Sequence, residues 1–426
     1  MSRSTVWHPF TQHAIAPLPV PIVAAEGAYL TAADGRRIYD GISSWWVVTH
    51  GHRHPCIIDA IKRQADQLDQ VIFAGFTHAP AEEAAEKLVQ LTARSFGNTE
   101  LAHVFYSDSG STAVEAGLKM ALGFWRNIGV PRTRIIALEH AYHGDTIGTM
   151  SAGARGIFNA PYEPLLFDVA RLPFPALGRE QETFTALEEL LRQTPTAAII
   201  LEPLLLGAGG MLIYSPAVLR RLSEIGRAHG ALLIADEVMT GFGRTGTIFA
   251  CEQACITPDI LCVAKGLTGG SVPLAATLST RAIFDAHYST DRTKTFFHSS
   301  SYTANPIACA AASANLDIWL NEPVAERIAA LADFQSSRLA ALPNDGTFTD
   351  CRQIGTITAV DVAVNDAGYL ADIGPKLYQH AIANGVLLRP LGNTLYVMPP
   401  YCTTADDLDR VYAVMQSAVQ AVTSRM

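Results

Sequence analysis

The stretch ALLIADEVMTGFGRTGTIFACEQACITPDILCVAKGLTGG, residues 231–270, is the clearest indication of the fold class of this chain. It holds two apolar runs of strand length, ALLIA and ILCVA, which lead directly into the charged residues Asp236 and Lys265. A helical pattern with Ser215 as its N-cap and Gly230 at its end comes just before them. Buried strands that alternate with amphipathic helices are typical of a mainly parallel sheet covered on both faces.

The alternation continues toward the N-terminus. We expect further strands at HVFYSD (103–108), RIIALE (134–139) and AAIILEP (197–203), and a helix in the segment STAVEAGLKMALGFWRNIG that follows the first of them. Residues 18–42 have the pattern of a β-meander with a turn at Asp34-Gly35.

After about residue 320 the pattern changes to two long helical segments and short strands around GTITAVDVAV and NTLYVMPP. The sequence therefore predicts an α/β protein of two domains. A large domain, residues 45–320, holds the mainly parallel sheet, and a small α+β domain is assembled from residues 1–44 and 321–426.

The composition excludes several classes of protein. The chain has 426 residues, a net charge of −9, 49% hydrophobic and 17% charged residues, so it is neither disordered nor suited to nucleic acid as a main partner. Its most apolar stretch, residues 197–214, is interrupted by Glu202 and Pro203, and the N-terminus has no run of signal-peptide type. The seven cysteines are scattered and odd in number, which favours free thiols and a cytoplasmic protein without membrane contact.

Two motifs point to other chemistry. Residues 241–246 fit G-x-G-x-x-G, but a dinucleotide site needs these glycines at the end of a strand and the start of a helix, and here they come later. A metal-dependent hydrolase could be built on His50, His52, His54 and His143. An arginine lies between two of the first three histidines, and nothing in the sequence fixes the position of a fourth ligand. Both features disfavour a metal site, and we expect no metal.

Lysine is scarce and therefore informative. The chain has six lysines, at positions 62, 87, 119, 265, 294 and 376. Lys265 differs from the others because it follows an apolar strand and precedes the turn-rich GLTGGSVP. Apolar surroundings lower the pKa of an amine and make it available as a nucleophile.

Three other features fall at carboxyl ends of predicted strands, where open α/β sheets bind ligands. Asp236 is an acid that needs a partner, Gly110-Ser111 begin a helix whose free N–H groups suit a phosphate, and Tyr142 offers an aromatic face. One ligand needs all of these and Lys265, because it has a phosphate, a ring, a pyridine nitrogen and an aldehyde. That ligand is pyridoxal 5′-phosphate.

With these residues in view, the sequence resembles the class III (ω-) aminotransferases of the type I pyridoxal-phosphate-dependent transferase fold. The resemblance covers nearly the whole chain through the ordered stretches VFYSDSGSTAVEAGLKMA, HAYHGDT, EPLLLGAGGM, IADEVMTGFGRTG, AKGLTGG and SYTANPIAC. It implies an enzyme in which Lys265 bonds covalently to the cofactor and moves a proton, while Asp236 keeps the ring nitrogen protonated.

The resemblance also implies the remaining contacts. Gly110 and Ser111 would bind the phosphate, Tyr142 would stack on the ring and line the substrate site, and Glu202 would lie near the face of the cofactor. Ser300 and Ser301 would reach the phosphate from the neighbouring subunit, which makes the active unit a homodimer with shared active sites.

Three further stretches, WHPFTQ, DGISSWWVVTHGHRHP and GVLLRPLGNTLYVMPPY, resemble the branch of this family that serves biotin biosynthesis. That branch implies 8-amino-7-oxononanoate as amino acceptor and S-adenosylmethionine as donor. Substrate contacts would come from Phe10, Trp45, Trp46, Tyr142, Lys265, Ser299, Arg389 and Tyr396. Arg389 could form a bidentate pair with the substrate carboxylate, supported by Tyr396.

Two departures from the family pattern bear on the substrate. Phe10 stands where a tyrosine is common, and Ser299-Ser300-Ser301 stand where Gly-Pro-Thr is common. The second change is similar to enzymes of this family that use lysine as donor, so another ω-aminotransferase with a different donor and acceptor is the alternative. A non-catalytic homologue is disfavoured because Lys265 and Asp236 are intact.

Overall fold

The computed structural model describes residues 5–364 and 368–423. Its centre is a seven-stranded sheet of order β4-β12-β11-β10-β7-β5-β6. These strands are β4 (Leu101–Ser107), β5 (Arg134–Leu138), β6 (Ala170–Leu172), β7 (Thr196–Leu201), β10 (Leu232–Asp236), β11 (Ile260–Val263) and β12 (Ala275–Thr280).

The sheet is mainly parallel, which confirms the prediction. β10 pairs in parallel with β7 and β11, while β12 runs antiparallel to both of its neighbours. All residues of β7 and β11 are buried, because helices cover both faces and leave no polar side. The carboxyl ends of the parallel strands therefore meet at one edge.

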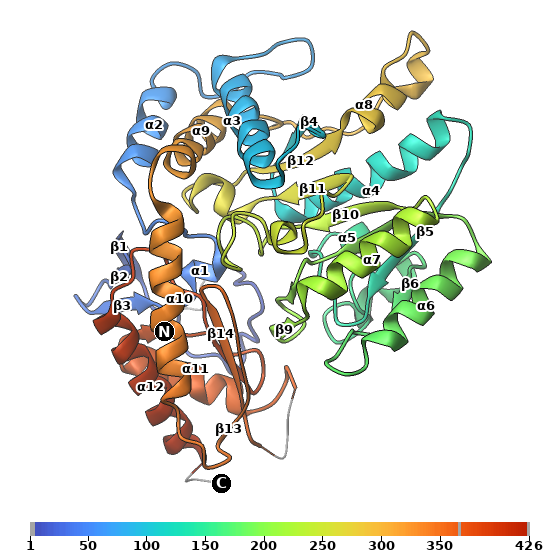
Figure 1. Ribbon diagram of the computed structural model, residues 1–426. Helices are drawn as coiled ribbons and strands as arrows, with labels where there is room; N and C mark the ends of the chain where they lie inside the picture. The colour runs from blue at the N-terminus through green and yellow to red at the C-terminus, as the bar shows by residue number, and fades with distance from the viewer. Residues whose placement is uncertain (1–4, 365–367, 424–426) are drawn as a thin grey trace.

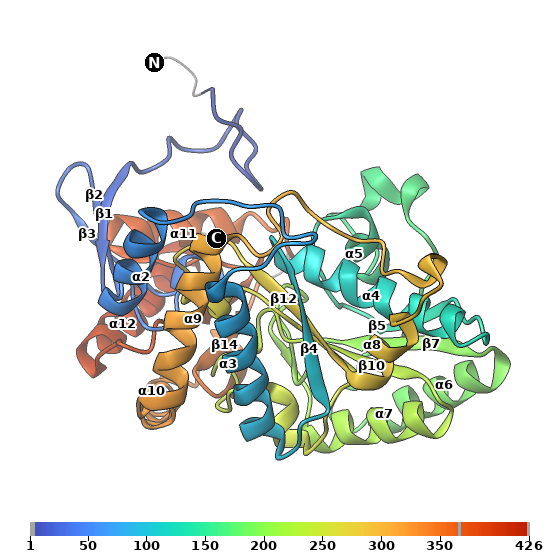
Figure 2. The same cartoon turned by 90° about the horizontal axis from the view of Figure 1, so that it is seen from above.

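Helices lie on both faces of this sheet, with α4 and α5 on one side and α6 and α7 on the other (Figures 1 and 2). The helices up to residue 321 are α1 (Ser43–Trp46), α2 (Pro55–Ala65), α3 (Ala79–Phe96), α4 (Gly110–Asn127), α5 (Ile147–Ala152), α6 (Glu180–Gln193), α7 (Pro216–Ala228), α8 (Arg281–His287) and α9 (Pro306–Asn321). Short 3-10 turns are η1 (Ala160–Leu165), η2 (Ala250–Ala254), η3 (Lys265–Thr268) and η4 (Arg292–Lys294). Ser215 caps α7 as predicted, since its hydroxyl accepts from Val218 N.

The strands of the N-terminal part and the helices of the C-terminal part lie together beside the large sheet (Figures 1 and 2). The meander predicted in residues 18–42 forms β1 (Ile22–Glu26), β2 (Tyr29–Ala32) and β3 (Arg37–Asp40), and β3 pairs in parallel with β15 (Val386–Leu387). The limits of the two domains at residues 45 and 320 stay a prediction.

The C-terminal part contains a further three-stranded sheet of order β13-β14-β16. The elements are α10 (Val324–Ala340), β13 (Phe348–Ile354), β14 (Ile357–Val362), α11 (Ile373–Ala383), β16 (Thr394–Val397) and α12 (Ala405–Thr423). A two-stranded pair, β8 (Leu205–Leu206) and β9 (Leu212–Ile213), completes the list. The two long helices expected after residue 320 are α10 and α12, and the shorter α11 lies between them.

Two strands of the large sheet were not predicted, the three-residue β6 and the antiparallel β12. Strand β12 follows a reversal at Gly269-Gly270, where both glycines have positive φ, +63° and +88°. A Cβ on Gly270 would come within 2.8 Å of the Val47 backbone, so this close passage of two chain segments requires glycine. Within the described residues, no helix is both long and apolar enough to cross a membrane.

Candidate active site

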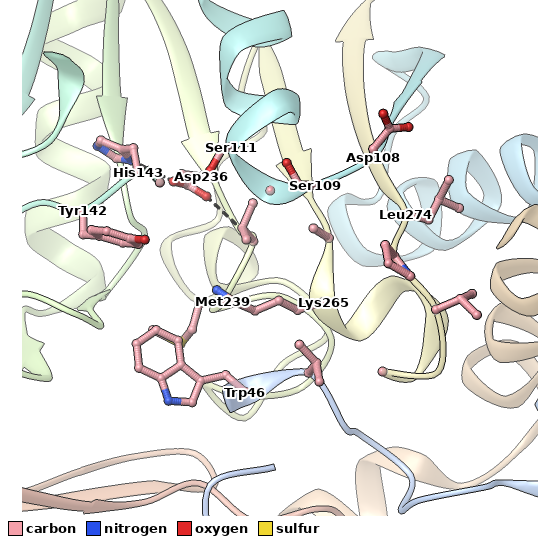
Figure 3. A pocket seen from close by; sticks show the side chains of 18 of the residues that line it. Trp46, Asp108, Ser109, Ser111, Tyr142, His143, Asp236, Met239, Lys265 and Leu274 are labelled. Carbon is pink, nitrogen blue, oxygen red and sulfur yellow. Dashed lines mark hydrogen bonds and ion pairs between the residues drawn. The ribbon is translucent and has the colours of Figure 1, made fainter. Parts of the chain in front are cut away.

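A cavity of about 460 Å³ opens at the carboxyl ends of the parallel strands (Figure 3). The sequence-predicted residues that line it are Trp46, Gly110, Ser111, Tyr142, Glu202, Asp236 and Lys265. They come from six separate segments of the chain, and the end of a strand or the start of a helix positions most of them. The structure thus brings together the residues proposed to hold the ring, the phosphate and the reactive amine.

Lys265 stands at the floor of this cavity, directly after β11. Its backbone has a φ of +42°, a left-handed conformation that costs free energy in a non-glycine residue. The Nζ atom lies 5.0 Å from the centre of the Trp46 ring and forms no ion pair with the described residues. Burial lowers the pKa of Lys265 to about 8, against the opposing effect of the nearby Asp236 carboxylate. A fraction of the amine is therefore neutral near pH 7.

The turn that carries Lys265 is anchored by a residue that no sequence pattern indicated. Asn315 on α9 is fully buried, and its Nδ2 donates to the carbonyls of both Gly266 and Leu267 at 3.0 Å. Two carbonyl acceptors require the amide nitrogen, so the orientation of the Asn315 side chain is fixed. Asn315 is separated from Lys265 by 50 residues of sequence, and no local pattern connects them.

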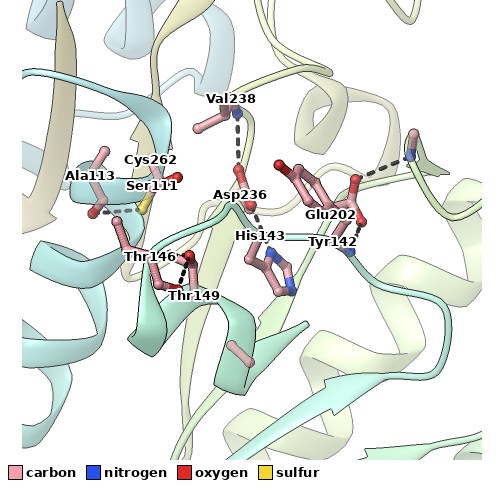
Figure 4. Close-up of polar contacts among 12 residues, drawn as sticks. Ser111, Ala113, Tyr142, His143, Thr146, Thr149, Glu202, Asp236, Val238 and Cys262 are labelled. Carbon is pink, nitrogen blue, oxygen red and sulfur yellow. Dashed lines mark hydrogen bonds and ion pairs between the residues drawn. The ribbon is translucent and has the colours of Figure 1, made fainter. Parts of the chain in front are cut away.

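Asp236, the last residue of β10, is held by two contacts (Figure 4). Its Oδ2 lies 2.7 Å from Nδ1 of His143, and its Oδ1 accepts from Val238 N at 3.1 Å. The His143 side chain is fully buried. The sequence suggested His143 only as a metal ligand; the structure places it behind the acid, where it orients the carboxylate. The HAYHGD motif could have indicated this, since His143 follows Tyr142.

The N-terminus of α4 forms the next wall of the cavity. Ser109 caps the helix through Thr112 N, while the N–H groups of Gly110 and Ser111 have no acceptor among the described residues. A Cβ on Gly110 would lie 2.5 Å from Val238 Cγ1, so this close approach requires glycine. Free N–H groups at the positive end of a helix bind phosphate well.

Glu202 closes the cavity behind Tyr142. Its two carboxylate oxygens accept from Tyr142 N at 2.9 Å and from Gly207 N at 3.1 Å. Burial raises the pKa of Glu202 to about 7, and the same cause raises the pKa of the Tyr142 phenol above its ordinary value. Glu202 therefore fixes the backbone that presents the tyrosine ring.

The residues predicted to bind substrate form two sets of contacts near the main cavity. The Arg389 guanidinium lies 4.4 Å from the centre of the Trp45 ring, and Trp46 Nε1 donates to the Tyr396 hydroxyl at 3.0 Å. Phe10 packs edge-on against Trp45, with ring centres 5.5 Å apart. Of these five residues, Trp46 lines the main cavity and Phe10 lines a separate one, and the other three are linked to them through these contacts.

Two aromatic residues that the sequence did not single out form a chain of ring contacts that begins at Phe10. Phe158 contacts Phe10, with ring centres 6.0 Å apart, and Tyr369, at 4.5 Å. Both line a second cavity of about 240 Å³, which shares Tyr142 with the first. An apolar substrate chain can lie along such a surface. The residues are far apart in sequence and belong to loops, so only the fold brings them together.

The three serines Ser299, Ser300 and Ser301 do not line the main cavity. Ser299 and Ser301 are exposed, and the Ser300 hydroxyl donates to the Asp108 carboxylate, which does line it. Gln70 Nε2 donates to Ser301 O at 2.7 Å. The predicted contact of Ser300 and Ser301 with a phosphate thus lies outside the cavity that one chain forms.

The histidines of the alternative metal site are dispersed. His52 Nε2 lies 2.8 Å from Asp40 Oδ2, His50 packs between His54 and Trp319, and His143 contacts Asp236. Within residues 5–364 and 368–423, no three His, Cys, Asp or Glu side chains form a group able to hold a metal ion. The geometry gives the metal-hydrolase interpretation no support.

Comparison with known proteins identifies the family. The model of the class III aminotransferases matches residues 10–419. The chain is a class III aminotransferase. It is an enzyme of a pyridoxal-phosphate-dependent family, as the sequence predicted.

Relatives of known sequence cover the whole chain. The adenosylmethionine-8-amino-7-oxononanoate aminotransferase of Synechococcus elongatus is 47% identical, over 99% of this chain and 100% of its own length. The protein of the same name from Nitratidesulfovibrio vulgaris is 40% identical, over 99% of this chain and 81% of its own.

Solved structures agree with this class III aminotransferase in fold. The adenosylmethionine-8-amino-7-oxononanoate aminotransferase of Methanocaldococcus jannaschii superposes with a TM-score of 0.92 at 32% identity, over 98% of this chain and 97% of that one. An amine transaminase of an uncultivated Pseudomonas species, in its pyridoxal-phosphate-bound form, gives 0.91 at 32% identity, over 99% of each chain.

The cavity of this aminotransferase fits pyridoxal phosphate on its own chemistry. The unbonded N–H groups of Gly110 and Ser111 suit the phosphate, the buried Asp236 suits the ring nitrogen, and the unpaired amine of Lys265 suits the aldehyde. A Cβ on Gly144 would overlap the Ser111 hydroxyl at 2.1 Å, so the loop after Tyr142 packs directly on the start of α4.

Proposed function

We propose that this enzyme transfers an amino group from S-adenosylmethionine to C7 of 8-amino-7-oxononanoate, giving 7,8-diaminononanoate for biotin synthesis. The names of the relatives support the reaction. The observation in the structure that carries the choice of acceptor is Arg389 over Trp45, because it sets a fixed cation beside an apolar wall. A chain with an apolar stem and a terminal carboxylate needs both.

The proposed chemistry runs in two halves that use the same side chains. When bound, pyridoxal phosphate would supply an aldehyde carbon, which takes up the amino group in the first half and releases it in the second, and a ring that accepts electrons. Lys265 Nζ takes the proton from the donor carbon and later delivers one to C7 of the acceptor. Its pKa of about 8 suits an amine that must both accept and release a proton near neutral pH.

The other residues bind and orient. Asp236, held by His143, stabilises positive charge at the ring nitrogen, and the start of α4 binds the phosphate. Tyr142 stacks on the ring, with its backbone fixed by Glu202. Trp45, Trp46, Phe10 and Tyr396 form the apolar wall of the acceptor site, with Ser299 at its outer edge.

We further propose that two copies of the chain share each site, with Ser300 and Ser301 directed to the phosphate of the other copy. Large apolar side chains are exposed near these serines, including Ile72 (62%), Phe76 (62%), Phe297 (70%) and Tyr302 (61%). Exposed apolar surface of this kind is typical of an interface between subunits. Light scattering of the purified protein measures its mass directly.

A half-reaction tests the donor. The purified enzyme is mixed with S-adenosylmethionine or with lysine, and the visible absorbance of the bound cofactor is followed. We expect S-adenosylmethionine to bleach it. Bleaching by lysine alone would instead favour the branch of the family that uses lysine, which the change at residues 299–301 leaves open.

A variant tests the acceptor site. Arg389→Ala is expected to raise the KM for 8-amino-7-oxononanoate by about 10- to 100-fold, because a charge-assisted pair contributes about 1.5–3 kcal/mol. Arg338→Ala, which removes an arginine paired with Asp409 on the surface, is the control. An unchanged KM in Arg389→Ala would favour an ω-aminotransferase with an acceptor that has no carboxylate.

A further inference from the structure

The tryptophan pair of the active site stands on a turn of unusual handedness. Ser43, Ser44, Trp45 and Trp46 all have positive φ, at 51°, 46°, 67° and 75°. Four successive non-glycine residues in this region form one turn of left-handed helix, closed by a hydrogen bond from Trp46 N to Ile42 O at 2.8 Å.

Such a turn opposes the intrinsic preference of the chain. In L-residues the left-handed conformation costs roughly 1–2 kcal/mol per residue. The four residues together therefore need external contacts that stabilise this conformation, and strain of this kind gathers at functional sites.

The stabilising contacts converge on Asp40, the last residue of β3. Its Oδ1 accepts from Ser44 N at 2.8 Å and its Oδ2 from the Ser44 hydroxyl at 2.7 Å. Asp40 is fully buried, and His52 Nε2, 2.8 Å from Oδ2, holds it from the other side. A second contact, from the Ser43 hydroxyl to Met398 O at 2.7 Å, anchors the start of the turn.

The turn positions both tryptophans for contacts with cations. Trp46 lies beneath the Lys265 amine at 5.0 Å and Trp45 beneath the Arg389 guanidinium at 4.4 Å. A right-handed or extended backbone at Ser44 would point the rings of Trp45 and Trp46 in other directions, because the backbone angles at Ser44 set the orientation of the residues that follow it.

We propose that Asp40 is a positioning residue for catalysis and substrate binding, which acts by holding Ser43–Trp46 in the left-handed turn that sets Trp46 under Lys265 and Trp45 under Arg389. The proposal rests on the proposed roles of Lys265 and Arg389. It predicts that the effect of losing Asp40 depends on backbone handedness at Ser44, and not on the buried charge itself.

Glycine tests this dependence, because it adopts positive φ without steric cost. Asp40→Ala is expected to lower kcat/KM by about 10- to 100-fold, the scale on which small displacements of reacting groups act. Adding Ser44→Gly to Asp40→Ala should raise kcat/KM again by about tenfold. A double-mutant cycle of the two substitutions measures this coupling. The matched control adds Ser223→Gly, which places glycine in the right-handed α7, and should restore nothing.

A second readout uses the cofactor-free protein. The near-ultraviolet circular dichroism of the tryptophans is expected to change in Asp40→Ala and to return toward that of the wild type with Ser44→Gly. This readout does not depend on which donor or acceptor the enzyme uses, so it separates failure of this proposal from failure of the proposed function. If Asp40→Ala does not fold, Asp40→Asn is used in the same cycle.

Two results would overturn the proposal. In the first, Asp40→Ala keeps the kcat/KM and the dichroism of the wild type. In the second, Ser44→Gly restores no more of the kcat/KM than Ser223→Gly does. Asp40 would then contribute only to the general stability of the sheet that contains β3.

Discussion

The carboxyl edge of the large sheet and the loop at residues 292–302 contribute to the proposed site in opposite ways. At the sheet edge, Asp236 and Glu202 are buried and hydrogen-bonded to fixed neighbours, and the partly buried Lys265 presents its unpaired amine to the cavity. In the loop, Phe297 and Ser301 are exposed. One chain therefore brings together the residues proposed to hold the ring and the amine, whereas the proposed phosphate contacts of the exposed loop would need the second copy of the proposed dimer.

The largest expected effect lies at the sheet edge. Lys265→Ala is expected to lower kcat by at least about 10³-fold, because the residue both bonds the cofactor and moves the proton. The visible absorbance of the bound cofactor should change at the same time. Lys62→Ala, at an exposed lysine of α2, is the control, and comparable activity in the two variants would refute the role of Lys265.

Asp236→Asn is expected to lower kcat by about 10²- to 10³-fold, the typical effect of losing a charge that stabilises a reacting group. Asp259→Asn is a matched control at the opposite end of β10, where Asp259 accepts from Leu233 N at 2.7 Å. It removes a partly buried carboxylate that does not line the cavity, so it should lower the melting temperature and leave kcat unchanged. An equal loss of kcat in Asp236→Asn and Asp259→Asn would contradict a specific role for Asp236 in the reaction.

Stability should depend on the pH through the buried carboxyls. Burial raises the pKa of Glu237 from 4.5 to about 7, so the folded protein binds this proton more tightly than the unfolded chain. Its contribution to stability is full below pH 4.5 and is lost as the pH rises to about 7, a change of about 3 kcal/mol. Glu202, with its pKa of about 7, acts in the same direction.

Urea unfolding at pH 5 and pH 7.5 measures this loss. Glu237→Gln should make the free energy of unfolding less dependent on pH, by about the contribution of one carboxyl. Glu182→Gln, at an exposed carboxylate paired with Arg179, is the control. It should not remove the pH dependence of the free energy of unfolding that Glu237 causes. A pH dependence equal to that of the wild type in Glu237→Gln would contradict the assignment.

The smallest expected effect lies in the exposed loop. Ser301→Ala should weaken cofactor binding by about tenfold, because it removes one hydrogen bond to a charged phosphate. The dissociation constant is measured by titration of the cofactor-free protein. Ser289→Ala, at an exposed serine just upstream, is the control. Unchanged affinity in Ser301→Ala would show that the start of α4 holds the phosphate without the loop.

Local patterns predicted the parallel strands β5, β7, β10 and β11 and several of the residues that line the main cavity, but they missed the three-residue β6. Asp236 and Lys265 stand at or just after the ends of apolar runs, and Gly110-Ser111 begin a helix, so their positions follow from the strand and helix pattern alone. β12 was missed because its direction depends on a tight passage of Gly270 past Val47. This close passage depends on the packing of two segments against each other, so the direction of β12 cannot be predicted from either segment alone.

The class of fold, the family and the chemical groups of the cofactor site could all be predicted from the amino-acid sequence, because they depend on side-chain types placed at strand ends. Only the tertiary structure showed that His143 holds Asp236, that Asn315 anchors the turn of Lys265, and that Asp40 braces a left-handed turn beneath the tryptophans. The physical reason is the same in each case. These contacts join residues whose spacing follows no period, and a hydrogen bond between distant segments exists only once the chain has folded.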